Sequence, residues 1–236
     1  DYPWAPNSGG STTAPSVTPT VKLAAKAAKE KLIEILAQEY NTTADNISYA
    51  KKQFTLKESG EKISWKQACG ALDGTPVSEK AQWAEGLSSS GTAGCQFAEV
   101  EVDAETGRVK VTRMIAVQDC GLVVNLLTAR SQVNGGIIGE IGYAMFENRL
   151  LDVETGIMPN ADLENYKIPG ALEMPEFDVT FFDEAERGVI GLGEPPAIPG
   201  VGAIANAIAN ATGARIRELP ITPDKVLMAI EQGKEG

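Results

Sequence analysis

Residues 97–119 read FAEVEVDAETGRVKVTRMIAVQD, and this stretch decides the fold class. Residues 97–103 alternate apolar and charged side chains, which is the two-residue period of a half-buried strand. Glu105-Thr106-Gly107 then provide a turn, and apolar residues return at Val109, Val111, Met114 and Ile115. The pattern predicts an antiparallel β-hairpin.

Helices and one further strand are predicted after the hairpin. A helix is expected over 126–146 despite four internal glycines, each of which costs about 1 kcal/mol relative to alanine. That cost indicates close approach of another backbone or a ligand. A strand is expected at 177–183, a buried alanine-rich helix at 201–212, and a last helix from Thr222-Pro223-Asp224 to about residue 232. Strands and helices that do not alternate regularly favour an α+β fold.

The N-terminal third predicts a separate, smaller part. Residues 1–19 are rich in Pro, Gly, Ser and Thr and are typical of a tail, after which Thr18 or Thr20 caps a helix to about residue 40. Residues 46–65 predict a small antiparallel meander, followed by a short helix that ends near Gly70 or Gly74. We therefore expect subdomains at 1–73 and 95–236, joined by a polar linker at 74–94.

Composition excludes several classes of function. The chain has 236 residues, a formal net charge of −11 at pH 7 and no histidine. The acidic balance argues against nucleic-acid and anionic-membrane surfaces, and no apolar stretch reaches the length of a membrane span. Without histidine, His-based zinc sites and catalytic triads are excluded. The three cysteines are too few for an iron–sulfur cluster, and we expect isolated, buried thiols.

Three stretches combine glycine with polar side chains near the start of a predicted helix: residues 9–16 (GGSTTAPS), 131–136 (SQVNGG) and 191–196 (GLGEPP). Such places can hold anionic oxygens with free backbone amides. Each also has a purely structural interpretation. The first would be a flexible terminus, the second a helix packing face, and the third a tight turn with a solvated glutamate.

Glu194 is the most informative of these residues. The start of a following helix would favour its carboxylate, whereas burial among Leu192, Pro195, Pro196 and Ile198 would raise its pKa. If burial dominates, Glu194 is a candidate general base. No histidine or lysine near it in sequence could be its partner, so the partner would be a cofactor or a substrate.

Four ordered motifs carry a family resemblance. They are DCGLVVN (119–125), SQVNGGIIGEIGYAMFE (131–147), NADLENYKIPGALEMPEFDV (160–179) and GLGEPPAIPGVGAIANAIANATGARIRELPITPDKV (191–226). Together they resemble the C-terminal part of the large, molybdopterin-binding subunit of xanthine oxidase-family molybdenum hydroxylases. The resemblance covers nearly the whole chain and is densest from 95 to 230.

The resemblance implies roles for particular residues. In that family the glutamate of a G-x-G-E motif sits beside molybdenum and deprotonates a metal-bound hydroxide, and Glu194 occupies the matching position after Gly193. The family's Q-x-x-G-G segment touches the pterin and maps to Gln132, Gly135 and Gly136. The Ser/Thr-rich segment before the first helix approaches the pterin and phosphates. It maps to Ser11, Thr12, Thr13, Ala14 and Ser16.

The resemblance also implies cofactors, partners and a reaction. The cofactor would be molybdopterin cytosine dinucleotide with molybdenum, no metal ligand is assigned to this chain, and electrons would leave through [2Fe-2S] clusters, often to flavin, on other chains. The N-terminal portion of the large subunit would be a separate or cleaved partner. The substrate would be an aldehyde or N-heterocycle oxidised with oxygen from water.

Two other functions remain open at this stage. The chain could be a non-catalytic scaffold in which Glu194 is inert, or a chain that inserts the cofactor into such a complex. Cytoplasm is the expected compartment, with the periplasm as the alternative if a leader has been removed.

Overall fold

The structure of the chain, a computed structural model, describes residues 9–84, 91–182 and 184–234. These residues divide into two compact units. Residues 15–84 form the first, and residues 9–14, 91–182 and 184–234 form the second. The boundaries predicted above placed residues 9–14 with the N-terminal part, whereas they belong with the second unit, where the backbone of Ser11 lies against Gly191.

In the first unit, a long helix packs on a small sheet. Helix α1 spans Thr13–Glu39, of which only Thr13 and Ala14 fall in the second unit, and it buries Leu32, Leu36 and Ala37. The helix was expected to start after Thr18 or Thr20, and this was wrong. Pro19 lies inside the helix, where its missing N–H leaves out one intrahelical hydrogen bond without ending the helix.

The meander of the first unit is confirmed. Strands β1 (Ile47–Ala50), β2 (Gln53–Leu56) and β3 (Lys62–Ser64) form an antiparallel sheet, and helix α2 (Trp65–Gly70) follows directly. Ser64 begins α2 with a capping box, because its Oγ accepts from the N–H of Gln67 and its own N–H donates to the Gln67 side chain. Phe54 is fully buried between Tyr49 and Trp65.

The second unit is built on the predicted hairpin. Strands β4 (Ala93–Val102) and β5 (Val109–Asp119) pair antiparallel, and β6 (Glu176–Phe182) adds to β5 in parallel. The tight turn forms because the Asp103 carboxylate accepts from the N–H groups of Glu105 and Thr106, and Gly107 has a φ of 72°. A bulge at Glu99/Val100 shifts the register, and both Val111 and Met114 are buried.

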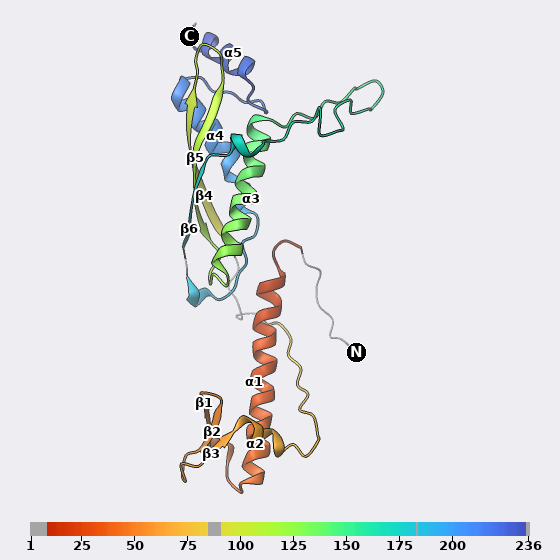
Figure 1. Cartoon of the computed structure of the whole chain (residues 1–236), viewed down its shortest axis with the longest axis vertical. Coiled ribbons are helices and arrows are strands. Elements are labelled where there is room, and N and C mark those ends of the chain that lie inside the picture. The colour runs from red at the N-terminus through yellow and green to blue at the C-terminus, as the bar shows by residue number, and fades with distance from the viewer. Residues whose placement is uncertain (1–8, 85–90, 183, 235–236) are drawn as a thin grey trace. The chain divides into compact units, whose positions relative to one another are not determined.

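Three helices complete the second unit (Figure 1). They are α3 (Leu126–Met145), α4 (Pro199–Thr212) and α5 (Pro223–Lys234), and each confirms a predicted helix to within two residues at its start. One core joins the sheet to all three helices, so the α+β class is confirmed. Its buried members are Val111, Met114, Ala116, Val133, Ile137, Ile141, Ala144, Val179, Ile204, Ile208, Ile221 and Val226.

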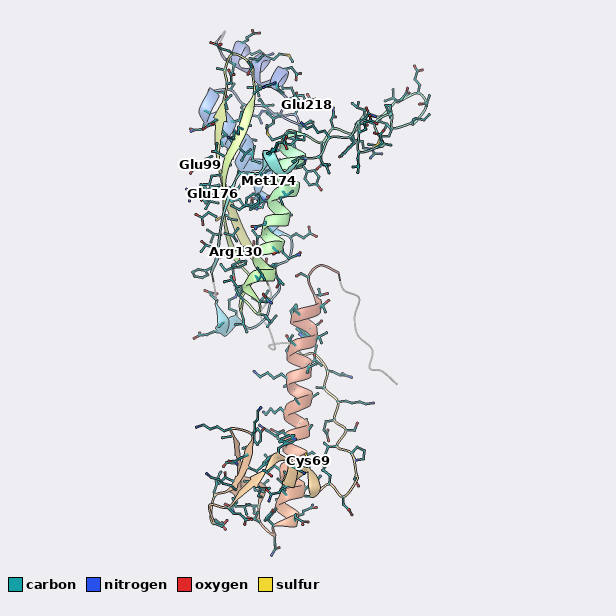
Figure 2. All side chains as sticks on the ribbon, in the orientation of Figure 1. Cys69, Glu99, Arg130, Met174, Glu176 and Glu218 are labelled. Carbon is teal, nitrogen blue, oxygen red and sulfur yellow. The ribbon has the colours of Figure 1, made fainter. Side chains whose placement is uncertain are left out.

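A row of charged side chains crosses the three strands of this sheet. Arg113 on β5 is in register with Glu99 on β4 and with Glu176 on β6, and Figure 2 labels both glutamates. The Arg113 guanidinium lies 3.4 Å from the Glu99 carboxylate and 2.7 Å from that of Asp178. Opposite charges on adjacent strands favour this pairing register over registers shifted by one residue.

The cysteines are only partly as expected. Cys120 is buried and Cys69 is half-buried, but Cys95 is exposed, so the prediction of three buried thiols was wrong. Cys95 is on β4, where the neighbouring Gln96 is buried, and the alternation of the strand turns the Cys95 side chain outward. Among the described helices, none is both long and apolar enough to cross a membrane.

Two adjacent isoleucines on α3 test which face of this helix packs into the core. Ile137 is fully buried in the sheet–helix core, whereas Ile138 is 38% exposed. We expect Ile137→Ala to lower the free energy of unfolding by about 2–5 kcal/mol because it leaves a cavity. Ile138→Ala makes the same chemical change on the outer face and should cost less than about 1 kcal/mol. Urea denaturation of both variants gives the comparison, and equal losses would contradict the orientation of α3.

Candidate functional site

The loop that carries Glu194 depends on two glycines. Gly191 and Gly193 have φ values of 90° and 61°, which side chains rarely tolerate. Space is limited as well, because a Cβ on Gly191 would lie 2.6 Å from the carbonyl oxygen of Ser11. The hydroxyl of Thr92 donates to the Leu192 carbonyl over 2.9 Å and fixes the loop between the two glycines.

Helix α3 lies directly against the next turn of the same loop, the 3₁₀ turn η4 (Pro195–Ala197). A Cβ on Gly136 would collide with the Pro196 carbonyl, standing only 2.8 Å from its carbon atom. This confirms the prediction that a helix glycine permits close approach of another backbone. Gln96 on β4 donates from Nε2 to the same carbonyl oxygen over 2.9 Å, so the turn is held from both sides.

These contacts leave a cavity of about 470 Å³ within the second unit. It brings together six of the residues predicted above from three distant segments, namely Ser11, Gln132, Gly135, Gly136, Gly193 and Glu194. Gly135 has no atom within 4 Å of the position of a Cβ, so its backbone borders open space. The remaining lining residues are Gly10, Ser131, Leu192, Pro196 and Ala197.

Four residues predicted at this site do not line the cavity: Thr12, Thr13, Ala14 and Ser16. Thr12 turns its hydroxyl back to the Gly9 carbonyl, 2.8 Å away. Thr13, Ala14 and Ser16 lie in the first turn of α1, and the Ser16 carbonyl accepts from the Thr20 hydroxyl over 2.6 Å. Because the helix begins earlier than expected, only Ser11 of the Ser/Thr-rich segment reaches the cavity.

The Glu194 side chain is exposed. Of the two possibilities left open by the sequence, the structure therefore has the tight turn with a solvated glutamate and not burial among the apolar neighbours. The physical reason is the 3₁₀ turn that follows it. The Ala197 N–H donates to the Glu194 carbonyl over 2.8 Å, and this turn buries Pro196 while Ile198 stays 64% exposed. Glu194 lines the cavity, and the other lining residues are uncharged.

Two buried polar residues beside the loop were not predicted. Glu140 on α3 is fully buried, and its Oε1 accepts from the N–H of Gly200 over 2.6 Å. Gln96 is 8% exposed and holds the Pro196 carbonyl. The sequence does carry one signal for Glu140, because it follows Gly136 by four residues and so lies on the same side of the helix.

Known proteins with similar sequences define the family of this chain. Residues 1–175 match the molybdopterin cofactor-binding domain family. The chain is 32% identical over 234 residues to the xanthine dehydrogenase molybdenum-binding subunit of Escherichia coli O157:H7, covering 95% of this chain and 31% of that protein. It is 33% identical over 235 residues to the aldehyde oxidoreductase molybdenum-binding subunit PaoC of Escherichia coli K12, covering 96% and 31%.

A solved structure shows the same fold. Carbon monoxide dehydrogenase from Oligotropha carboxidovorans superposes with a TM-score of 0.82 at 22% identity, over 99% of this chain and 31% of that one. The chain thus spans about a third of the length of these relatives. It belongs to the molybdopterin cofactor-binding domain family, and the resemblance to the large subunit of xanthine oxidase-family enzymes is confirmed.

The cavity fits part of such a cofactor. Its lining includes Gln132 and Ser11, whose amide and hydroxyl can form hydrogen bonds, and glycine backbone can approach a flat ring system or a phosphate closely. Ser131 also lines it, but its hydroxyl donates to the Leu127 carbonyl over 2.9 Å. A side chain at Gly135 would project into the open space that borders its backbone. Within the described residues, no three His, Cys, Asp or Glu side chains are grouped to hold a metal ion.

Two glycines of α3 test the contact that builds the cavity. Gly136→Ala would place a methyl group against the Pro196 carbonyl and should destabilise the protein by about 1–3 kcal/mol, because backbone must move. Gly139→Ala makes the same change where no atom lies within 4 Å of the Cβ position, and should stabilise the helix by about 0.5–1 kcal/mol. Opposite signs in thermal unfolding are expected, and two stabilised variants would contradict the contact.

Proposed function

We propose that this chain forms part of the molybdopterin cytosine dinucleotide site of a molybdenum hydroxylase. The reaction would be oxidation of an aldehyde or N-heteroaromatic carbon, with water as the source of oxygen. The observation that supports this most is the cavity itself, because it is lined by Glu194, Gln132 and Gly135 together. In the family, the counterpart of Glu194 is a base, and the counterparts of Gln132 and Gly135 belong to a pterin-binding segment.

The residues that would hold the cofactor are those that line the cavity. Gln132 and Ser11 would supply hydrogen bonds, and Gly135 would let backbone approach it closely. Gly136 and Gly193 also line the cavity, and they would contribute by letting the loop after Glu194 pack on α3 and turn at a positive φ. Thr12, Thr13, Ala14 and Ser16 follow Ser11 directly, and in this proposal they contribute by placing Ser11. When bound, the molybdenum cofactor would supply the two-electron oxidation and act as a Lewis acid.

Glu194 would act as the general base. A carboxylate oxygen of Glu194 would accept the proton that water gives up as its oxygen is transferred to the substrate carbon. The residue suits this task because it lines the cavity and has an exposed side chain, while its backbone is fixed by the 3₁₀ turn. A fixed backbone limits the positions open to the carboxylate, which is what orientation of a catalytic group requires.

Partner chains would complete the site. Large apolar side chains are exposed on the segment after α3, which extends away from the rest of its unit (Figure 1). Val153 is 89% exposed, Leu163 80% and Leu172 97%. We propose that these side chains belong to an interaction surface, as a contiguous apolar patch would. We assign them to the N-terminal portion of the large subunit, with an iron–sulfur subunit and often a flavin subunit as further partners in the cytoplasm.

A non-catalytic scaffold is the second candidate function, and a cofactor-insertion chain is the third. The scaffold would use the exposed apolar segment but not the carboxylate of Glu194. An insertion chain would associate with the enzyme only transiently, so gel filtration of the native complex would find it in less than equal proportion to the other subunits. The place of Glu194 in the lining of the cavity, together with Gln132 and Gly135, favours the catalytic function over both.

Replacement of the carboxylate tests the catalytic role. Glu194→Gln keeps the size of the side chain but cannot accept the proton, so kcat of the assembled enzyme should fall by about 100- to 10,000-fold. Molybdenum and nucleotide content should stay unchanged, because the amide still fits the loop. Glu186→Gln is the matched control, since Glu186 is exposed and does not line the cavity. An undiminished kcat in Glu194→Gln would refute the catalytic role of Glu194 and support the non-catalytic scaffold.

A further inference from the structure

The segment that follows Glu194 is anchored by two buried polar side chains from opposite elements. Gln96 on β4 donates from Nε2 to the Pro196 carbonyl over 2.9 Å. Glu140 on α3 accepts at Oε1 from the N–H of Gly200, the second residue of α4, over 2.6 Å. One anchor holds Pro196, in the 3₁₀ turn next to the cavity, and the other holds Gly200, at the start of α4. The segment between these two residues is therefore fixed at both ends.

The second carboxylate oxygen of Glu140 and the amide oxygen of Gln96 have no hydrogen-bond partner. Oε2 of Glu140 and Oε1 of Gln96 are both buried and accept no hydrogen bond. They also converge on one point, because a Cβ on Gly200 would collide with Oε2 of Glu140 and lie 2.5 Å from Oε1 of Gln96. Two buried acceptor oxygens that face the same space are unfavourable unless a donor lies between them.

Turning the Gln96 amide over does not remove the conflict. Its Nε2 would then face Glu140, but its Oε1 would face the Pro196 carbonyl, which is also an acceptor. With an ionised Glu140, one pair of acceptors therefore faces the same space without a donor in either orientation. A single proton on Glu140 satisfies both oxygens in the orientation that the structure shows.

We propose that Glu140 is a neutral carboxylic acid, that it donates its proton to Oε1 of Gln96, and that the pair positions the Glu194 loop. Glu140 and Gln96 do not line the cavity, so they act through the backbone of residues 196–200 and are positioning residues. Their role in turnover rests on the proposed function. The protonation of Glu140 and the anchoring of residues 196–200 are independent of that function.

Burial supports the neutral form. Loss of solvent raises the pKa of Glu140, and hydrogen bonds from the Gly200 N–H and from the Gln96 side chain lower it with smaller effects. The lowering by Gln96 requires its amide to donate to Glu140, whereas its Nε2 donates to the Pro196 carbonyl and turns Oε1 toward Glu140. The groups that face the carboxyl are Gln96 from β4 and the Gly200 backbone from α4, and neither carries a charge. The positive end of α4 would favour an anion, but the anion would leave the Gln96 oxygen unpaired.

Infrared difference spectroscopy of the assembled enzyme tests the protonation directly. At neutral pH the wild type should show the carbonyl stretch of a protonated carboxylic acid, and Glu140→Gln should lose it. Glu101→Gln is the matched control, because Glu101 is an exposed glutamate on β4, and it should keep the band. A spectrum in which Glu140→Gln loses no such band would overturn the proposal.

Paired variants test the anchoring. Glu140→Gln reproduces a protonated acid, since its oxygen can accept from Gly200 and its amide can donate to Gln96, so the unfolding midpoint and kcat should stay near wild type. Glu140→Leu leaves two buried groups unpaired, and should lower the midpoint by roughly 5–15 °C. It should also lower kcat at least about tenfold, because the Glu194 loop is no longer held in position.

The two variants also separate this proposal from the catalytic one. Equal damage in Glu140→Gln and Glu140→Leu would show that an ionised carboxylate is needed and would refute the neutral acid. If Glu140→Leu does not fold, the Glu140→Gln midpoint and the infrared band still decide. Neither measurement depends on molybdenum or on Glu194, so a failure of the proposed function would leave both results in place.

Discussion

The carbonyl of Pro196 lies where a side chain on Gly136 would begin, and the site depends on this contact. Because position 136 has no Cβ, the turn after Glu194 can lie directly on helix α3. The same carbonyl accepts a hydrogen bond from Gln96, so one oxygen atom joins the sheet to the loop beside the helix. The cavity then forms with Glu194 on the loop side and Gln132 and Gly135 on the helix side.

The fold places these groups by ordinary packing. The hairpin of β4 and β5 buries one face against α3, α4 and α5, and this core fixes α3 relative to the loop. Gly191 and Gly193 allow the loop to turn in a conformation that other residues rarely adopt, and Ser11 lies against the first of them. Residues that are far apart in sequence therefore meet without a disulfide among the described residues.

Much of the fold could be predicted because its signals are local. The alternation in residues 97–119 gave the hairpin, and Ser64 and Gln67 sit where a capping box begins α2. The start of α1 could not be predicted, since Pro19 normally limits a helix and here lies inside one. The parallel pairing of β6 with β5 is a long-range contact, and no short stretch of sequence encodes it.

The candidate site also has features that the sequence predicts and features that only the folded chain shows. The motifs identified Glu194, Gln132 and the glycines, which the cavity brings together, but not the exposure of Glu194, because that depends on the turn that buries Pro196. Thr12, Thr13, Ala14 and Ser16 were predicted with Ser11 as one segment, yet the helix that begins at Thr13 separates them from the cavity. Glu140 and Gln96 were missed because their function depends on a pairing between α3 and β4 that only the folded chain shows.

The most direct test is the composition of the native assembly, purified through a tag on this chain. Molybdenum and released cytidine nucleotide would be measured per mole of the chain. We expect close to one of each, because the cavity beside Glu194 is proposed to form part of a dinucleotide cofactor site. A stable, fully assembled complex that contains neither would contradict it.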